Sequence, residues 1–459
     1  ILGAKFMTMS KTVALVGRPN VGKSTLFNRL TRTRNAIVGS QPGLTRDRHY
    51  GIVKTQQSKF IVVDTGGLEF DKDLTRGVFG EMAKQAAQAV DESDLTLFIV
   101  DLRAGLTNED LLIADQLRKS GRPLWVIANK GEGARSSLAL AEFYELGLGE
   151  PRIISAAHGD GVSDLISEIE SELQSDLGEG DTAQNELEDR HPVMAIIGRP
   201  NVGKSTLVNS IIGEERVIAF DKPGTTRDAI EIQFQREGRD YTIIDTAGVR
   251  KRGKVNEVIE KFSVIKALQA MEESNVVVLV VDGTEGISDQ DVNLAAFAVE
   301  AGRAMVVVIN KWDICDEVAR EVVDRTYRRK LRFLDFAKVH RISATKGSGI
   351  SGLLRSVDIA FKSSRMNLPT PQLTRVLKTA TERQSPPRKG YNRPKLRYAH
   401  QGGINPPLVV IHGNSIEGVP ESYRRYLESS FTTAFKLQGA QVRVVFKQGS
   451  NPFSKRSRP

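Results

Sequence analysis

A stretch of 18 residues occurs twice in this chain, and the repeat limits what the chain can fold into. "VALVGRPNVGKSTLFNRL" at 13–30 returns as "MAIIGRPNVGKSTLVNSI" at 194–211, so that Gly17 lies 181 positions before Gly198 (198 − 17). The same spacing relates three further pairs: Thr45 and Thr226, Asp64 and Asp245, and Asn129 and Asn310. A constant spacing over widely separated motifs indicates a duplicated domain, because chance matches would not keep one register.

Short apolar runs alternate with helical stretches in each copy. In the first copy the runs "TVALVG", "FIVVDT", "LTLFIVD", "PLWVIAN" and "RIISA" alternate with "KSTLFNRLT" and "TNEDLLIADQLRKS". This alternation predicts an α/β fold, with a mostly parallel sheet covered by helices on both faces. In such sheets the ligand binds at the carboxyl ends of the strands, where every motif discussed below falls.

With 459 residues the chain is too long for one hydrophobic core, and changes in composition predict how it divides. The expected segments are 1–9, an added or disordered extension; 10–172, the first α/β domain; 173–191, an acidic flexible linker; 192–365, the second α/β domain; 366–448, a small basic α+β domain; and 449–459, a basic disordered tail. The single cysteine, Cys315, excludes an internal disulfide framework and is expected to be an inert buried thiol.

The net charge of +9 is unevenly distributed. Residues 371–459 hold 16 Lys+Arg against 4 Asp+Glu, which gives +12 and leaves −3 for the rest. This asymmetry favours a nucleic-acid partner over a role in solubility alone. Strands are expected at 406–413 and 439–447, and an amphipathic helix at 420–437. The aromatic and apolar residues of that helix are expected in the core rather than as base-stacking platforms: Tyr423, Tyr426, Leu427, Phe431 and Phe435. The G-x-x-G loop of RNA-binding KH domains is absent from "GNSIEG", so an RNA contact would rest on basic residues such as Arg388, Lys389, Arg393, Lys395 and Arg397.

"GRPNVGKS" matches the phosphate-loop pattern G-x-x-x-x-G-K-[ST] in both copies, between an apolar strand and a helix. Lys23 and Lys204 are expected to reach the β/γ-phosphates, and Ser24 and Ser205 to ligate Mg²⁺. The expected nucleotide contacts of the two loops are Gly17, Arg18, Pro19, Asn20, Val21, Gly22, Lys23, Ser24 and Thr25, and Gly198, Arg199, Pro200, Asn201, Val202, Gly203, Lys204, Ser205 and Thr206.

"VVDTGG" and "IIDTAG" follow each phosphate loop by about 40 residues. Asp64 and Asp245 are expected to hold Mg²⁺, and Gly67 and Gly248 to offer a backbone N–H to the γ-phosphate. The expected contacts here are Asp64, Thr65, Gly66, Gly67 and Leu68, and Asp245, Thr246, Ala247, Gly248 and Val249. Thr45 and Thr226 lie in the intervening loops, either as Mg²⁺ ligands of the triphosphate state or as ordinary turn residues. The candidate catalytic residues are Lys23, Thr45, Gly67, Lys204, Thr226 and Gly248.

"NKGE" at 129–132 and "NKWD" at 310–313 each end an apolar strand. The carboxylate of such a motif can accept the N1–H and exocyclic amine of guanine, whereas adenine offers an acceptor there and repels it. The lysine can lie along the ring, the asparagine can tie the base loop to the phosphate loop, and the later "SAA" and "SAT" can present an N–H to guanine O6. The expected base-site residues are Asn129, Lys130, Glu132, Ser155, Ala156 and Ala157, and Asn310, Lys311, Asp313, Ser343, Ala344 and Thr345.

With these motifs the chain resembles the bacterial double-GTPase family called EngA or Der, along essentially its whole length. The resemblance implies two tandem phosphate-loop GTPase domains followed by a KH-like domain. It also implies hydrolysis of GTP to GDP and phosphate, Mg²⁺ as a cofactor, and a cytoplasmic, monomeric protein. The implied partner is the maturing large ribosomal subunit, with its rRNA and ribosomal proteins.

Two positions depart from patterns found in such GTPases. Leu68 and Val249 stand where the Ras family has a glutamine that orients water, so hydrolysis by the protein alone is expected to be slow. The resemblance suggests that potassium, held partly by Asn20 and Asn201, completes the site. Glu132 replaces the expected aspartate and is one methylene longer, so either both hydrogen bonds to guanine lengthen or the backbone adjusts.

Two other classes of protein compete with a GTPase switch. A nucleotide kinase would need a lid and an acceptor pocket, for which the sequence shows no dedicated segment. A plain RNA-binding protein would hold nucleotide only as a structural ligand, without turnover. "KRGKV" at 251–255 either contacts RNA or is a solvated loop. "VVVLVV", an apolar run of the second copy, is far shorter than the ~20 residues of a membrane span.

Overall fold

The computed structural model describes residues 11–31, 37–38, 49–55, 59–65, 89–132, 137–175, 191–213, 217–219, 230–245, 264–388 and 393–448. The chain forms two compact units, Ile1–Asn185 and Glu186–Pro459, and each is described by itself. Among the described helices none is long and apolar enough to cross a membrane.

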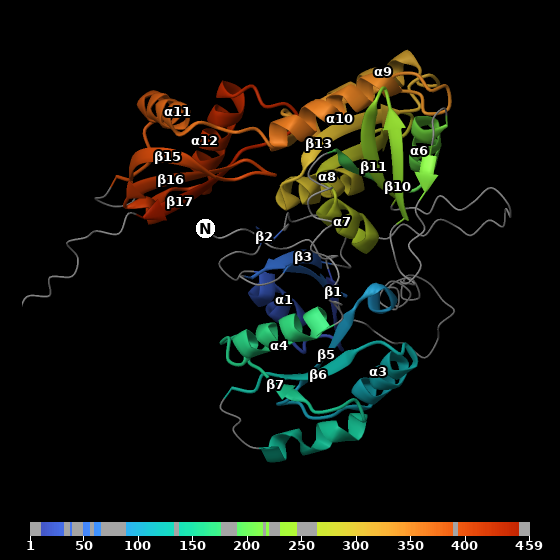
Figure 1. Ribbon diagram of the computed structural model, residues 1–459. Coiled ribbons are helices and arrows are strands. Elements are labelled where there is room, and N and C mark those ends of the chain that lie inside the picture. The colour runs from blue at the N-terminus through green and yellow to red at the C-terminus, as the bar shows by residue number, and fades with distance from the viewer. Residues whose placement is uncertain are drawn as a thin grey trace, which may run out of the picture. The chain divides into compact units, whose positions relative to one another are not determined.

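The first unit contains a seven-stranded sheet in the order β2-β3-β4-β1-β5-β6-β7 (Figure 1). β3 is antiparallel to β2 and β4, and the other neighbouring strands are parallel. The elements are β1 (Lys11–Val16), α1 (Lys23–Thr31), β2 (Ile37–Val38), β3 (His49–Lys54), β4 (Lys59–Asp64), β5 (Leu95–Asp101), α3 (Asn108–Lys119), β6 (Leu124–Asn129), η1 (Ser137–Leu146), β7 (Arg152–Ile153) and α4 (Val162–Ser175).

The central strands of this sheet are buried on both faces. In β1, Val13 and Leu15 pack in the cluster that contains α1 and α4, whereas Ala14 and Val16 pack in the cluster that contains α3 and η1. Successive side chains of a strand point to opposite faces, so an unbroken apolar run is what such a strand requires. The predicted mostly parallel sheet with helices on both faces is confirmed for this unit.

The second unit begins with an equivalent sheet in the order β14-β13-β12-β8-β11-β10-β9. β10 is antiparallel to both its neighbours, and the remaining pairs are parallel. The elements are β8 (Val193–Ile197), α6 (Lys204–Ile212), β9 (Val217–Ala219), β10 (Ile230–Arg236), β11 (Arg239–Asp245), α7 (Val264–Glu273), β12 (Val276–Asp282), α8 (Asp289–Ala301), β13 (Ala304–Asn310), α9 (Glu317–Lys330), η2 (Arg332–Leu334), β14 (Lys338–Arg341) and α10 (Ile350–Ser364).

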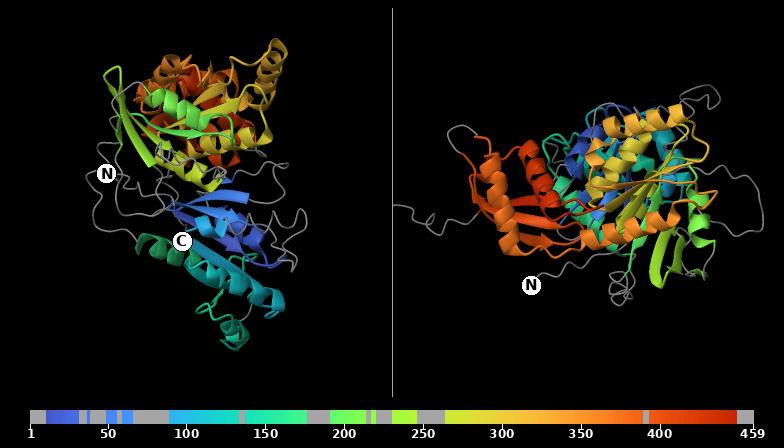
Figure 2. Two further views of the ribbon diagram at one scale, coloured as in Figure 1. Left: turned by 90° about the vertical axis from the view of Figure 1, so that its right-hand side faces the viewer. Right: turned by 90° about the horizontal axis from the view of Figure 1, so that it is seen from above.

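The small C-terminal domain is a three-stranded sheet, β15-β16-β17, with α11 and α12 on one face (Figures 1 and 2). β15 is antiparallel and β17 parallel to the central β16. The elements are α11 (Thr370–Arg383), β15 (Lys395–Gly403), β16 (Leu408–Asn414), η3 (Ile416–Gly418), α12 (Glu421–Ala434) and β17 (Arg443–Gln448). As expected, Tyr423, Leu427 and Phe431 of α12 are buried in the core, with Tyr426 and Phe435 packed against it.

Main-chain hydrogen bonds join this domain to the α/β part of the same unit. The Gly439 N–H donates to Phe336 O at 2.7 Å, and Met305 N–H donates to Gly439 O at 2.6 Å. The guanidinium of Arg443 donates to Val299 O and Glu300 O in the last turn of α8. The C-terminal domain has its own apolar core and also contributes Ala440 to the core of the α/β part.

Two details bear on the expectations from sequence. α4 continues to Ser175, into the range 173–191 assigned to the linker, because Leu173 packs in the core of the first unit. Cys315 is buried and donates to Lys311 O at 3.2 Å. Burial raises the pKa of its thiol, as expected for an inert cysteine.

Candidate functional site

The phosphate-loop motif of the first unit connects the end of β1 to the start of α1 and is closely packed. Asn20 adopts a left-handed φ of 65°, and Gly22 has a φ of 101°. A Cβ at Gly22 would lie 2.2 Å from Asn129 Nδ2, so only glycine fits there. The Lys23 ammonium donates to Gly17 O at 2.8 Å and Arg18 O at 2.7 Å.

The second unit repeats this geometry. Asn201 has a φ of 62°, and a Cβ at Gly203 would lie 2.3 Å from Asn310 Nδ2. The Lys204 ammonium donates to Arg199 O at 2.7 Å. In both loops the valine (Val21, Val202) is buried, whereas Asn20, Thr25, Asn201 and Thr206 are exposed.

Lys23 and its neighbours form a compact ionic group at the carboxyl edge of the sheet. Burial lowers the pKa of Lys23 to about 8, against the opposing attraction of Asp64. Ser24 Oγ donates to Asp64 Oδ2 at 2.7 Å, and Asp64 is fully buried. A hydroxyl next to one buried carboxylate is a donor set that suits Mg²⁺, which takes one or two protein oxygens and completes its shell with phosphates and water. The residues present therefore fit the ion.

Asn129 joins the phosphate loop to the loop after β7. Its Nδ2 donates to Val21 O at 2.8 Å, and its Oδ1 accepts the Ala156 N–H at 2.9 Å. In the second unit Asn310 bonds to Val202 O and Ala344 N–H, both at 2.9 Å. The expected tie between base loop and phosphate loop is present in both units. The Ala156 N–H already donates to Asn129 Oδ1. It could donate to guanine O6 as well only by sharing its hydrogen between the two acceptors.

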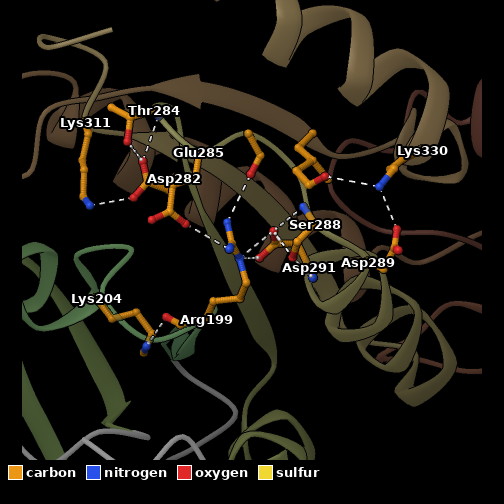
Figure 3. A network of polar contacts seen from close by, with 12 residues as sticks. Arg199, Lys204, Asp282, Thr284, Glu285, Ser288, Asp289, Asp291, Lys311 and Lys330 are labelled. Atoms are coloured by element: carbon orange, nitrogen blue, oxygen red, sulfur yellow. Dashed lines mark hydrogen bonds and ion pairs between the residues drawn. The ribbon is translucent and has the colours of Figure 1, made fainter. Parts of the chain in front are cut away.

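The lysine of each base motif is held by an aspartate that the sequence analysis did not single out. Lys130 Nζ donates to Asp101 Oδ2 at 2.6 Å, and Lys311 Nζ donates to Asp282 Oδ2 at 2.6 Å (Figure 3). Burial works against ionisation of both carboxylates, but the lysines and nearby N–H groups hold their pKa below the usual value. Both lysines have a left-handed φ, 66° and 60°.

The two base carboxylates lie in different surroundings. Glu132 accepts from Ser155 Oγ at 2.9 Å and from the Arg103 guanidinium at 2.8 Å. Its own backbone N–H, and then Ser155, lower its pKa. Asp313 pairs with Lys346 at 3.3 Å, and a hydrogen bond from the Ser343 hydroxyl is the main cause of its lowered pKa. Both side chains are 20% exposed, so both carboxylates are ionised and reachable at neutral pH.

The side chains of Arg18 and Arg199, expected as nucleotide contacts, instead point to the first turns of α3 and α8. Arg18 Nε donates to Asp110 at 3.3 Å. Arg199 binds Asp291 at 3.0 Å, Glu285 at 3.1 Å and Gly286 O at 3.2 Å (Figure 3). The aspartates cap their helices through Thr107 and Ser288. Four aspartates of these networks went unnoticed, although they keep the same spacing of 181: Asp101 and Asp282, and Asp110 and Asp291.

Several expected site residues lie outside the described part of the chain: Thr45, Gly66, Gly67, Leu68, Thr226, Thr246, Ala247, Gly248 and Val249. For Asp245 only the backbone, at the end of β11, is described. The segments 1–9, 251–255 and 449–459, and Lys389, also lie outside it. Of the "SAA" and "SAT" loops, Ser155, Ala156, Ser343 and Ala344 are buried, and Ala157 and Thr345 are exposed.

Two sheets with the same carboxyl-edge geometry define a tandem phosphate-loop GTPase. The family described as "50S ribosome-binding GTPase" matches residues 12–130 and 193–311. A second model, "KH-domain-like of EngA bacterial GTPase enzymes, C-terminal", matches residues 367–447. The predicted fold class, two GTPase domains followed by a KH-like domain, is thereby confirmed.

Curated relatives agree along the whole chain. GTPase Der of Chromobacterium violaceum is 58% identical, covering 97% of this chain and 93% of the relative. GTPase Der of Neisseria gonorrhoeae is 58% identical (97% and 90% covered), and that of Nitrosospira multiformis is 56% identical (98% and 95%). The chain belongs to the GTPase Der (EngA) family, and it binds and hydrolyses GTP.

Proposed function

We propose that the protein is a GTP-driven switch in assembly of the large ribosomal subunit, acting as a monomer in the cytoplasm. The observation that carries this proposal is the combination, in one chain, of two equivalent nucleotide sites with a domain segment that holds 16 Lys+Arg and 4 Asp+Glu. That charge suits rRNA, whose phosphates dominate affinity. The domain division expected from sequence stays part of this proposal, with the first domain extended to Ser175 at the end of α4.

In the nucleotide sites, the loop N–H groups and Lys23 or Lys204 would bind the phosphates. Ser24 with Asp64, and Ser205 with Asp245, would hold Mg²⁺, which neutralises phosphate charge when bound. Glu132 and Asp313 would accept the guanine N–H donors, with Asn129 and Asn310 fixing the distance from base loop to phosphate loop. Thr45 and Thr226 would join the site in the triphosphate state, while Gly67 and Gly248 would donate to the γ-phosphate.

Potassium is part of this proposal. The support for it is that Asn20 and Asn201 are exposed at left-handed positions of the phosphate loops, and that Leu68 and Val249 cannot orient water. GTP turnover should therefore be several-fold faster in potassium chloride than in sodium chloride of equal ionic strength. Replacing Asn201 with Ala should remove most of the second site's difference. Equal rates in the two salts would remove potassium from the proposal.

The ribosomal role is tested by co-sedimentation of the full chain with purified large and small subunits. We expect retention on large subunits with a non-hydrolysable GTP analogue, weaker retention with GDP, and little on small subunits at about 150 mM salt. Equal binding to both subunits, independent of nucleotide, would leave a GTPase without the proposed ribosomal role.

A further inference from the structure

The sheet of the C-terminal domain buries one face and leaves the other open. Ala399, Val409, Ile411 and Val444 are at most 3% exposed and pack with α11 and α12. The residues that alternate with them point away from the helices. We call them the open sheet face: Tyr398, His400, Val410, His412, Val445 and Lys447.

The strand register orders this face into two rows. Tyr398, His412 and Lys447 are neighbours across the three strands, and His400, Val410 and Val445 form the next row. Tyr398 is 46% exposed and Val445 is 44% exposed, which is unusual for large apolar side chains on a sheet.

Three rings gather on the open sheet face. Tyr398 and His412 stack with centroids 4.5 Å apart and planes 5° apart, and His400 lies 5.1 Å from His412. Burial, then the charges of His400 and Lys447, lower the pKa of His412, so its ring is neutral at pH 7. A preassembled ring cluster loses little entropy when another flat group stacks on it.

The charge of the strands is of one sign. They carry four basic residues and no acidic one; Arg443 is turned to α8, which leaves Lys395, Arg397 and Lys447 exposed. All four acidic residues of 371–459 lie on the helices or η3, outside the strands: Glu382, Glu417, Glu421 and Glu428. The exposed charges on the three strands are therefore all cationic, and they lie on the same sheet as the rings.

Rings beside cations match the chemistry of unpaired nucleic acid, whose bases offer flat π faces and whose backbone offers phosphates. A duplex hides its base faces, and an acidic protein would use the cations but leave the rings without stacking partners. The loop "GNSIEG" at 413–418 does not offer a competing site for the RNA backbone. Gly413 packs against β15, where a Cβ would lie 2.4 Å from Lys395 O.

We propose that the open sheet face binds single-stranded RNA, with unpaired bases stacked on Tyr398 and the histidine pair and phosphates held by Lys395, Arg397 and Lys447. This inference rests on the proposed RNA contact of the C-terminal domain and assigns it to a surface.

The test is fluorescence anisotropy of the full-length protein with a fluorescein-labelled single-stranded RNA of about 12 nucleotides and with its duplex. Tyr398→Ala should weaken binding of the single strand at least fivefold and leave duplex binding unchanged, whereas Tyr398→Phe should stay within twofold. Lys447→Ala should reduce the slope of log affinity against log salt by about 0.7. Arg425→Ala removes an equal charge from α12, on the opposite side of the domain, and should change neither result.

The outcomes separate this inference from the proposed function. If the protein binds RNA but Tyr398→Ala binds the single strand normally, the open sheet face is not the platform, and the ribosomal role stands. If Tyr398→Ala no longer binds large subunits but still binds RNA normally, the open sheet face is a protein-docking surface. If the full chain binds neither RNA nor large subunits, the proposed function fails too. Photo-crosslinking of 4-thiouridine RNA guards against misfolded variants: crosslinks should map to β15 and β16, and crosslinks confined to 388–393 or 449–459 would overturn the assignment.

Discussion

Glu132 stands where the second unit has Asp313, and the two carboxylates pair with different cations, Arg103 and Lys346. Arg103 holds one oxygen of the Glu132 carboxylate, whereas the position 181 residues later is Thr284, whose N–H and hydroxyl donate to Asp282 in its own loop. Arg103 also donates its backbone N–H to Asp101, the partner of Lys130. Arg103 therefore links the longer carboxylate to the loop that positions the base lysine.

We predict that Arg103→Thr weakens GDP binding to the first site about two- to five-fold, because the pair is partly exposed and the longer side chain loses its orientation. In the Glu132→Asp variant the shorter carboxylate no longer reaches Arg103. Adding Arg103→Thr to that variant should therefore cause no further loss of GDP affinity at the first site. The measurement is calorimetric titration of the full chain with the second site silenced by Lys204→Ala. An equal loss in both backgrounds would show that Arg103 acts independently of Glu132.

Lys23 predicts a pH dependence of nucleotide affinity. Its pKa is about 8 without nucleotide, and bound phosphates stabilise the charged ammonium, so binding takes up a proton above pH 8. Affinity of the first site for GDP should be level below about pH 7.5 and about tenfold weaker by pH 9. Lys23→Arg stays charged throughout and should give weaker but level affinity. A level wild-type profile would contradict the lowered pKa.

At the scale of elements, helix α8 is fixed at both ends by arginines. At its start Asp291, fully buried, accepts from Ser288 and from Arg199 of the phosphate loop; at its end Arg443 binds the last carbonyls. A carboxylate in the first turn and a cation at the C-terminus both interact favourably with the helix dipole. The helix thus connects the phosphate loop of the second unit with the C-terminal domain.

Asp291→Ala should lower the free energy of unfolding of the second unit by about 3 kcal/mol, since it removes the N3 half of the capping box and leaves Arg199 without its buried partner. Asp289→Ala, in the same turn but 71% exposed in its pair with Lys330, should cost less than about 0.5 kcal/mol. The chain has two tryptophans, Trp125 and Trp312, one in each unit, so Trp125→Phe makes fluorescence in urea report the second unit alone. If both variants lower the free energy of unfolding equally, the buried Asp291–Arg199 pair does not stabilise α8 as proposed.

The elements of the two GTPase-like parts were predictable from sequence, because buried parallel strands require unbroken apolar runs and the phosphate loops have a recognisable sequence motif. α11 was not predicted, although its core residues Leu373, Val376, Leu377 and Ala380 keep the i, i+3, i+4, i+7 spacing of an amphipathic helix and could have been found. β15 was missed because it turns Tyr398 and His400 to solvent and shows no simple alternation of apolar and polar residues. The aspartates that bind lysine and arginine kept the repeat spacing and could have been found. Arg103 could not, because only the fold brings it to Glu132.

In the whole molecule, main-chain bonds at Gly439 and the insertion of Ala440 join the C-terminal domain to the core of the second GTPase-like part. The two parts should therefore unfold as one cooperative body, although each has its own apolar core. Their junction has a steric limit at Gly439, whose φ is 74° and where a Cβ would lie 2.4 Å from Ala360 Cβ. Gly238, in the β10–β11 turn, has nearly the same φ of 73° but nothing within 4 Å of an added Cβ. The pair separates backbone strain from crowding at the junction.

Gly238→Ala should therefore destabilise the second unit by about 1 kcal/mol, the cost of a left-handed alanine. Gly439→Ala should cost about 1–3 kcal/mol more, because the Gly439 segment is bonded to Phe336 and Met305 and cannot move aside. Urea unfolding followed by Trp312 fluorescence in the Trp125→Phe chain measures both. If Gly439→Ala separates the two parts, far-UV circular dichroism should show the C-terminal domain unfolding at a lower urea concentration than the one at which Trp312 fluorescence changes. Equal costs with coincident transitions would mean that the two parts are held together elsewhere than at Gly439.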